Sequence, residues 1–137
     1  MTASSPQQLS ERYNEAFASG RLDDIVAMYE LDATLSPQPG VFVQGTSAIR
    51  ERLAGLIDLD GTLETGDQSC IVCGDIALIH ATWRFTGKSA TGAPLDLGGR
   101  SAKVARLQAD GTWKYVLDVP HGGAVPPNRS LERTREK

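Results

Sequence analysis

Apolar and polar positions follow two different periods along this chain. In the N-terminal part, apolar side chains recur every three or four residues, as they do on one face of a helix. Further along they recur at every second residue, which is typical of strands. Helices first and strands afterwards predict an α+β fold. The predicted helices run from Ser5 to Gly20, from Leu22 to Tyr29, and from Thr46 through Leu56.

The predicted strands fall into two groups. Two short ones, Ala33–Leu35 and Phe42–Val43, flank a loop at Ser36–Gly40, because Pro37 and Pro39 cannot donate to a strand ladder. The longer ones are expected at Thr62–Val72, Ile76–Thr86, Leu95–Leu107 and Trp113–Val119.

Glycines refine this picture of the long strands. Asp110-Gly111 predicts a tight hairpin between the last two of them. Gly98-Gly99, inside the third long strand, predicts a bulge or a sharp bend.

Composition sets the broad class of the protein. The 137 residues include 40% hydrophobic and 23% charged side chains, which is ordinary for a globular protein. We predict one domain over residues 1–124 and a disordered, proline- and charge-rich tail over 125–137. A net charge of −3 argues against a nucleic-acid partner. No apolar run is long enough for a membrane span and no secretory signal is evident, so the expected location is cytoplasmic.

Nothing in the sequence calls for a metal or a cofactor. Cys70 and Cys73 lie in an apolar, strand-like stretch and are expected to be structural thiols. The two histidines, His80 and His121, have no metal-site spacing, and no phosphate-binding glycine loop is present. We therefore expect neither a metal nor a cofactor.

Four phrases together resemble the nuclear transport factor 2-like superfamily, which includes steroid isomerases and SnoaL-type polyketide cyclases. The phrases are Gly20–Tyr29, Asp32-Ala33-Thr34-Leu35, Gly45-Thr46 with Ala48-Ile49-Arg50, and Asp110-Gly111-Thr112-Trp113. The resemblance implies a cone. Three N-terminal helices would pack in a strongly curved, mixed or antiparallel sheet of about six strands around an internal pocket. It also implies a homodimer formed through the outer face of the sheet.

The steroid isomerases use a tyrosine, a second acid and a carboxylate base. By resemblance, Tyr13 matches the tyrosine, Lys103 falls at the second acid, and Ser36 falls at the base. A serine cannot act as a base unaided, so the resemblance argues against conventional steroid isomerisation. Tyr13 shares a helical face with Leu9 and Phe17, so a purely structural role in the core stays open for it.

The strand Ile76–Thr86 admits two interpretations. Its alternation puts His80 and Arg84 on one face and Trp83 on the other. Burial of apolar side chains favours a buried Trp83 face, with His80 and Arg84 in water. The resemblance favours the opposite, with the His80 face lining the pocket, and we adopt it here. The outer, homodimer-forming face is then Ile79, Trp83 and Phe85.

Asp118 is the clearest candidate for chemistry, because it interrupts an otherwise apolar strand. A buried carboxylate needs a partner. If it faces inward, Arg84 or His80 could supply one, with Lys103 on a neighbouring strand. The alternative is that Asp118 ends its strand at the exposed rim in a surface ion pair.

The sequence supports a leading hypothesis and two alternatives. The leading one is a pocket that binds a small hydrophobic molecule and, if catalytic, performs cofactor-free isomerisation, cyclisation or hydrolysis. Its predicted catalytic residues are Asp118, His80 and Tyr13, and its substrate-binding residues are Arg84, Lys103, Ser36, Phe17 and Met28. The alternatives are a non-catalytic binding or dimerisation module, and a protein-interaction domain that uses the outer sheet face. The substrate and the presence of catalysis stay open.

Overall fold

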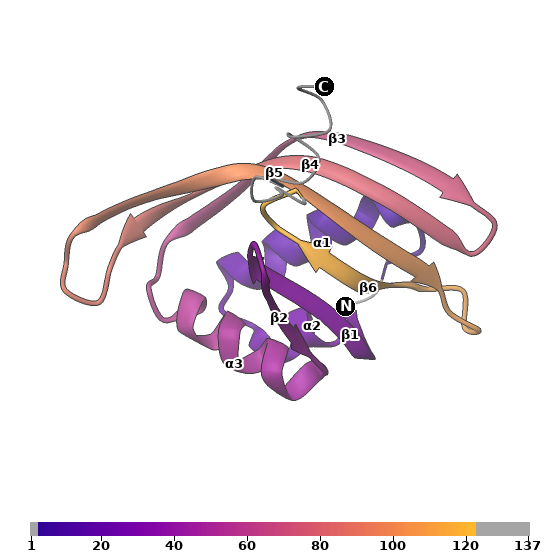
Figure 1. The fold of residues 1–137 in the computed structure, drawn as a ribbon, viewed down its shortest axis with the longest axis horizontal. Coiled ribbons are helices and arrows are strands. Elements are labelled where there is room, and N and C mark those ends of the chain that lie inside the picture. The colour runs from indigo at the N-terminus through magenta and orange to yellow at the C-terminus, as the bar shows by residue number, and fades with distance from the viewer. Residues whose placement is uncertain (1–2, 123–137) are drawn as a thin grey trace, which may run out of the picture.

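The computed structural model describes residues 3–122, which form three helices and one six-stranded sheet (Figure 1). The helices are α1 (Pro6–Ala18), α2 (Leu22–Val26) and α3 (Thr46–Ile57). The strands are β1 (Tyr29–Gln38), β2 (Val41–Gln44), β3 (Thr62–Cys73), β4 (Ile76–Lys88), β5 (Pro94–Leu107) and β6 (Trp113–Val119). The predicted α+β cone is therefore confirmed. The predicted tail at 125–137 lies outside the described residues.

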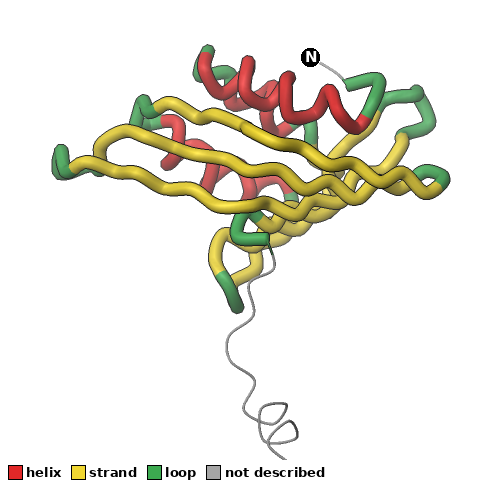
Figure 2. The backbone as a smooth tube through the Cα atoms, turned by 90° about the horizontal axis from the view of Figure 1, so that it is seen from above, coloured by secondary structure: helices red, strands yellow, loops and turns green. Residues whose placement is uncertain are grey.

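The sheet is mixed and open. Its strand order is β2-β1-β6-β5-β4-β3, in which only the β1–β6 pair is parallel. The three long strands β3, β4 and β5 curve over the helices, which all lie on one side of the sheet (Figures 1 and 2). The concave face and the helices therefore enclose the core.

The core consists of side chains from the concave face and from the helices. Leu9, Ile25 and Ile49 come from the three helices, and each is 0% exposed. From the sheet, Phe85 packs edge-on against Phe17 of α1 with ring centroids 6.1 Å apart. This packing joins α1 to the concave face of the sheet.

The boundary between the second helix and the first strand differs from the prediction. The helix ends at Val26, and Tyr29 already begins β1, which continues into the predicted loop as far as Gln38. Tyr29 pairs in parallel with Tyr115 of β6. This pairing between distant parts of the chain overrides the local helical pattern, and Pro37 is tolerated where the β1–β2 register shifts.

A bulge or a sharp bend was predicted at Gly98-Gly99, and the bulge is absent from the β4–β5 pairing. The β4–β5 register runs without a shift from Ile76 opposite Arg106 to Lys88 opposite Pro94. Glycine at position 98 instead allows β4 and β5 to approach closely, because a Cβ on Gly98 would lie 2.9 Å from the backbone carbonyl oxygen of Trp83. Among the long strands, the register shifts lie in the β3–β4 and β5–β6 pairings.

One row of paired residues crosses the sheet and positions the site. Ile79 of β4 lies opposite Lys103 of β5, Lys103 lies opposite Asp118 of β6, and Asp118 lies opposite Leu35 of β1. Paired residues in adjacent strands share a face. Because Ile79 is 1% exposed, the row faces the helices and brings two opposite charges inside.

Candidate functional site

A cavity of about 410 Å³ lies between the helices and the concave face of the sheet. Its walls are mostly apolar. They come from α3, β1 and the long strands: Leu35, Pro37, Leu53, Leu56, Leu63, Ile79, Ala81, Trp83, Phe85, Leu97 and Pro120. Its polar lining is smaller: Ser10, Tyr13, Asn14, Arg52, Thr65, Ser101, Lys103, Asp118 and His121. A mostly apolar cavity with few convergent polar groups is the usual form of a small-molecule site.

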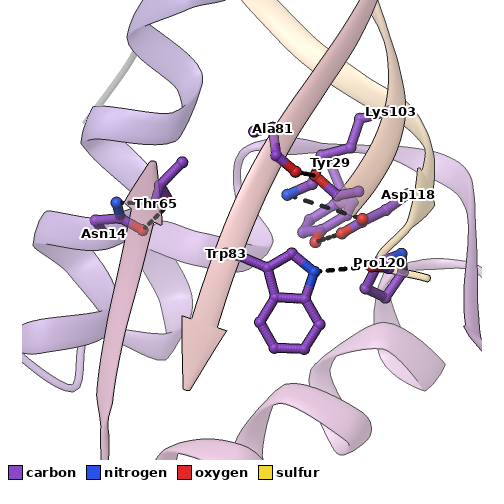
Figure 3. Close-up of polar contacts among 9 residues, drawn as sticks. Asn14, Tyr29, Thr65, Ala81, Trp83, Lys103, Asp118 and Pro120 are labelled. Atoms are coloured by element: carbon purple, nitrogen blue, oxygen red, sulfur yellow. Dashed lines mark hydrogen bonds and ion pairs between the residues drawn. The ribbon is translucent and has the colours of Figure 1, made fainter. Parts of the chain in front are cut away.

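Asp118 is the buried anion of this cavity, with 4% of its surface exposed. The Tyr29 hydroxyl donates a hydrogen bond of 2.6 Å to its Oδ2 atom. The Lys103 ammonium lies 3.8 Å from its Oδ1 atom, within ion-pair range but beyond hydrogen-bond length. The three side chains come from β1, β5 and β6 and point toward one another (Figure 3).

Lys103 is a largely buried cation that contacts two aromatic rings. Its ammonium lies 4.7 Å from the centre of the Tyr13 ring and 4.6 Å from that of the Tyr115 ring. Burial lowers the pKa of Lys103, but Asp118, Tyr115 and Tyr13 outweigh burial and raise it above its ordinary value. Lys103 therefore stays protonated and acts as a fixed positive charge rather than as a nucleophile.

The phenols of the site are hydrogen-bond donors at neutral pH. Burial raises the pKa of Tyr13 to about 12, since the pull of Lys103 only partly offsets it. Burial also raises the pKa of Tyr29, and the neighbouring Asp118 adds to this. Tyr13 lines the cavity, so its hydroxyl can donate to an oxygen of a bound molecule.

His121 lines the same cavity from the turn that follows β6. Its Nε2 atom lies 3.0 Å from the hydroxyl of Ser36, which is 2% exposed and also donates to the Gln38 carbonyl at 3.2 Å. The Trp83 indole donates a 2.7 Å hydrogen bond to the Pro120 carbonyl just before it (Figure 3). His121 is therefore fixed by contacts from two strands.

Two buried polar atoms that belong to cavity-lining residues have no hydrogen-bond partner within residues 3–122. They are Asp118 Oδ1 and His121 Nδ1. A buried polar atom left without a partner costs about 1–3 kcal/mol. Native proteins rarely carry this cost without a reason, so both atoms make the cavity a candidate binding site.

Comparison with known proteins settles the family. A model of the SnoaL-like domain matches residues 10–116. The chain belongs to the SnoaL-like family. No curated protein matches the sequence.

Solved structures agree with the SnoaL-like fold. A nuclear transport factor 2-like superfamily protein from Salmonella enterica serovar Typhimurium has a TM-score of 0.74 and 18% identity, over 88% of this chain and 89% of that one. A candidate ketosteroid isomerase from Shewanella frigidimarina has 0.68 and 16%, over 82% and 90%. A candidate dehydratase from Streptomyces avermitilis has 0.65 and 15%, over 82% and 90%. Identities this low establish the fold alone.

The SnoaL-like cavity brings together three of the residues singled out from the sequence. Asp118, Tyr13 and Lys103 all line it. Asp118 lies inside rather than at the rim, but its partners are Lys103 and Tyr29, not the Arg84 or His80 that the sequence suggested. The catalytic roles of these residues stay predictions.

The adopted interpretation of β4 is wrong about which face is inside. Trp83 lines the cavity, whereas His80 and Arg84 do not. Arg84 pairs with Asp96 through two hydrogen bonds of 2.7 and 2.9 Å, and both side chains are 61% exposed. Its guanidinium therefore cannot polarise a ligand in the cavity.

The face assigned to the homodimer is wrong for the same reason. Ile79 and Phe85 are 1% and 0% exposed in the single chain, and with Trp83 they belong to the cavity wall. They are unavailable to a second copy. A homodimer of the SnoaL-like chain, formed through other residues, stays a prediction.

Three predicted substrate-binding residues are not part of the cavity lining. Phe17 and Met28 are core residues that are 6% and 3% exposed. Ser36 contacts the cavity-lining residue His121 but does not line the cavity itself. Tyr29 was not predicted as a site residue, because the sequence pattern placed it at the end of a helix. His121 was not among the predicted site residues either, although the Pro-His-Gly pattern after a strand predicts a turn that can present the ring.

No group of three metal-ligating side chains lies together within residues 3–122. Cys70 and Cys73 are free thiols. None of the helices that the structure describes is both long and apolar enough to span a membrane.

Proposed function

We propose that this chain binds a small, largely hydrophobic molecule with a carbonyl or hydroxyl oxygen and moves a proton on it without a cofactor. The observation that carries the proposal is the buried Oδ1 atom of Asp118, which has no hydrogen bond within the described residues and belongs to the lining of a mostly apolar cavity. Relatives named as a candidate ketosteroid isomerase and a candidate dehydratase support this class of reaction.

The polar groups divide into two roles. Tyr13 and Lys103 present a hydroxyl proton and a positive charge, which stabilise negative charge on a substrate oxygen. This stabilisation makes a hydrogen on the adjacent carbon more acidic. Asp118 then accepts that proton at Oδ1, while Tyr29 occupies Oδ2. Returning the proton to another atom of the same molecule completes an isomerisation.

The test needs no knowledge of the natural substrate. A panel of hydrophobic cyclic ketones is incubated with the protein in deuterium oxide, and loss of α-protons is followed by proton NMR. We expect Asp118→Asn to slow exchange about 10²- to 10⁴-fold and Tyr13→Phe about 10²- to 10³-fold. Asp32→Asn, on an exposed carboxylate, is the matched control and should leave the rate unchanged.

A non-catalytic binding module is the second candidate. Its support is specific, because serine and lysine occupy two of the three positions that resemble the steroid-isomerase site, Ser36 and Lys103. Fluorescence titration with β-naphthol, a hydrophobic phenol, separates the candidates. Saturable binding together with no exchange on any ketone favours the module and overturns the catalytic proposal.

A further inference from the structure

The turn after β6 holds His121 in a defined place. The Gly122 amide donates a 3.0 Å hydrogen bond to the Val119 carbonyl, which closes a four-residue turn with proline at its second position. Trp83 fixes the Pro120 carbonyl at 2.7 Å. Gly122 has a φ of +71°, and a Cβ there would collide with a backbone carbonyl of β5. The turn is therefore built to present the residue between Pro120 and Gly122.

Ser36 determines which nitrogen of His121 carries the proton. The Ser36 hydroxyl has one hydrogen, and its 3.2 Å contact with the Gln38 carbonyl uses it, because a carbonyl oxygen can only accept. The 3.0 Å contact between Ser36 Oγ and His121 Nε2 then requires Nε2 to be the donor. In a neutral imidazole with a proton on Nε2, the lone pair lies on Nδ1. That atom is the one that is buried and has no hydrogen-bond partner among residues 3–122.

We propose that His121 is a second proton-transfer residue of this cavity, which offers an unprotonated Nδ1 atom to the bound molecule, and that Ser36 is the positioning residue that sets this tautomer. The inference rests on the proposed function and adds a residue to it. The Nδ1 lone pair takes a proton from a hydroxyl or an activated C–H group of the substrate. The N–H bond forms, and the electron pair of the broken bond stays on the substrate. The proton then returns to the same molecule or passes to water, so no oxidant or reductant is needed.

The arrangement also accounts for the serine at the position where the resemblance expects a carboxylate base. Ser36 is too weakly basic to accept the proton itself. It instead fixes an imidazole that the far end of β6 supplies. Together with Asp118, the cavity then has two acid–base groups on separate residues. Two such groups allow removal of a proton at one atom and delivery at another.

The tautomer can be measured without any substrate. The sequence holds only two histidines, so His80→Gln leaves His121 as the single imidazole. Nitrogen NMR of the neutral ring should show Nε2 protonated and Nδ1 bare. Adding β-naphthol should shift the Nδ1 resonance, because the phenol donates to it. A ring protonated on Nδ1, or an Nδ1 signal that β-naphthol leaves unmoved, overturns the proposal.

Variants then separate the proton-transfer role from a structural one. We expect His121→Gln, which can keep the bond to Ser36, to lower ketone exchange about 10²- to 10⁴-fold. Its β-naphthol affinity should fall only about fivefold, for the loss of one hydrogen bond. Ser36→Ala should lower kcat at constant KM and convert the ring to a mixture of tautomers. His80→Gln, outside the cavity lining, should match the wild type. Equal exchange rates in His121→Gln and the wild type contradict the inference.

Failure of the inference is distinct from failure of the proposed function. A wild-type protein that exchanges no ketone refutes catalysis, but the nitrogen spectrum still decides whether His121 accepts from a bound phenol. Conversely, exchange that depends on Asp118 and not on His121 retains the proposed function and removes this residue from it.

Discussion

Lys103 and Asp118 provide the sharpest test of the site's electrostatics. Their side chains are 16% and 6% exposed and their charged atoms lie 3.8 Å apart. With an effective dielectric constant of roughly 20, a pair at this separation attracts by about 4 kcal/mol. Lys103→Met removes the cation and leaves the carboxylate with only the Tyr29 hydroxyl. Breaking a buried pair in this way costs about 3–5 kcal/mol.

A double-mutant cycle in urea measures this cost. With an m-value of roughly 2 kcal/mol/M, Lys103→Met should lower the unfolding midpoint by roughly 2 M. Asp118→Asn should behave similarly, because it leaves Lys103 buried without its counter-charge. The double variant should lose only about 1–2 kcal/mol, since it removes both charges together. The sum of the two single costs minus the double cost then gives a coupling energy of about 4 kcal/mol or more.

Lys88→Met, on an exposed lysine of β4, is the matched control and should not change the midpoint. Single-substitution costs below about 1 kcal/mol that simply add in the double variant would refute the reasoning, because they would mean that the pair is effectively solvated. The cycle also calibrates the exchange assay, since it shows how much of any loss in Asp118→Asn reflects unfolding.

Three further predictions follow from the same geometry. Tyr13, Tyr29 and Tyr115 all have raised pKa values, so tyrosinate absorbance should stay low above pH 10 and then rise together with unfolding. Because folded Tyr13 holds its proton up to about pH 12, the free energy of unfolding should fall by about 3 kcal/mol between pH 10 and 12 from this residue alone. Ionisation of the tyrosines near pH 10, before the protein unfolds, would contradict this. Gly122→Ala should cost about 1–3 kcal/mol in urea and disturb the His121 nitrogen spectrum. Arg84→Ala should leave the urea midpoint unchanged, because its ion pair is exposed.

The strands were predictable because their signal is local. Alternation gave β6 its observed bounds, Trp113–Val119, and placed β3 and β4 within two residues at each end. The start of β1 was not predictable in this way. Tyr29 continues the apolar stripe of α2, and only its pairing with Tyr115, far along the chain, draws it into a strand.

The inward face of β4 depended on information that alternation does not contain. The pattern correctly separated His80 and Arg84 from Trp83, but it cannot say which set faces the helices. The register of β4 against β5 decides this, because Ile79 rather than His80 lies opposite Lys103. The rule that the larger apolar set is buried gave the correct inward face of β4, whereas the family resemblance gave the wrong one. The sequence did not predict His121 as a site residue, because its proposed role depends on its contact with Ser36, 85 positions away.

The ion pair of Lys103 and Asp118, in the row of paired residues that crosses the sheet, is itself an argument for function. A buried ion pair is weak evidence for stability, since apolar residues of similar size often stabilise a core equally well or better. Here the pair is also incompletely satisfied, because Asp118 Oδ1 has no hydrogen bond within the described chain. Such a group is costly unless a second molecule completes it. Lys103, Asp118 and His121 therefore support the proposed function, in which they form one half of a binding site and the ligand carries the complementary donor and acceptor atoms.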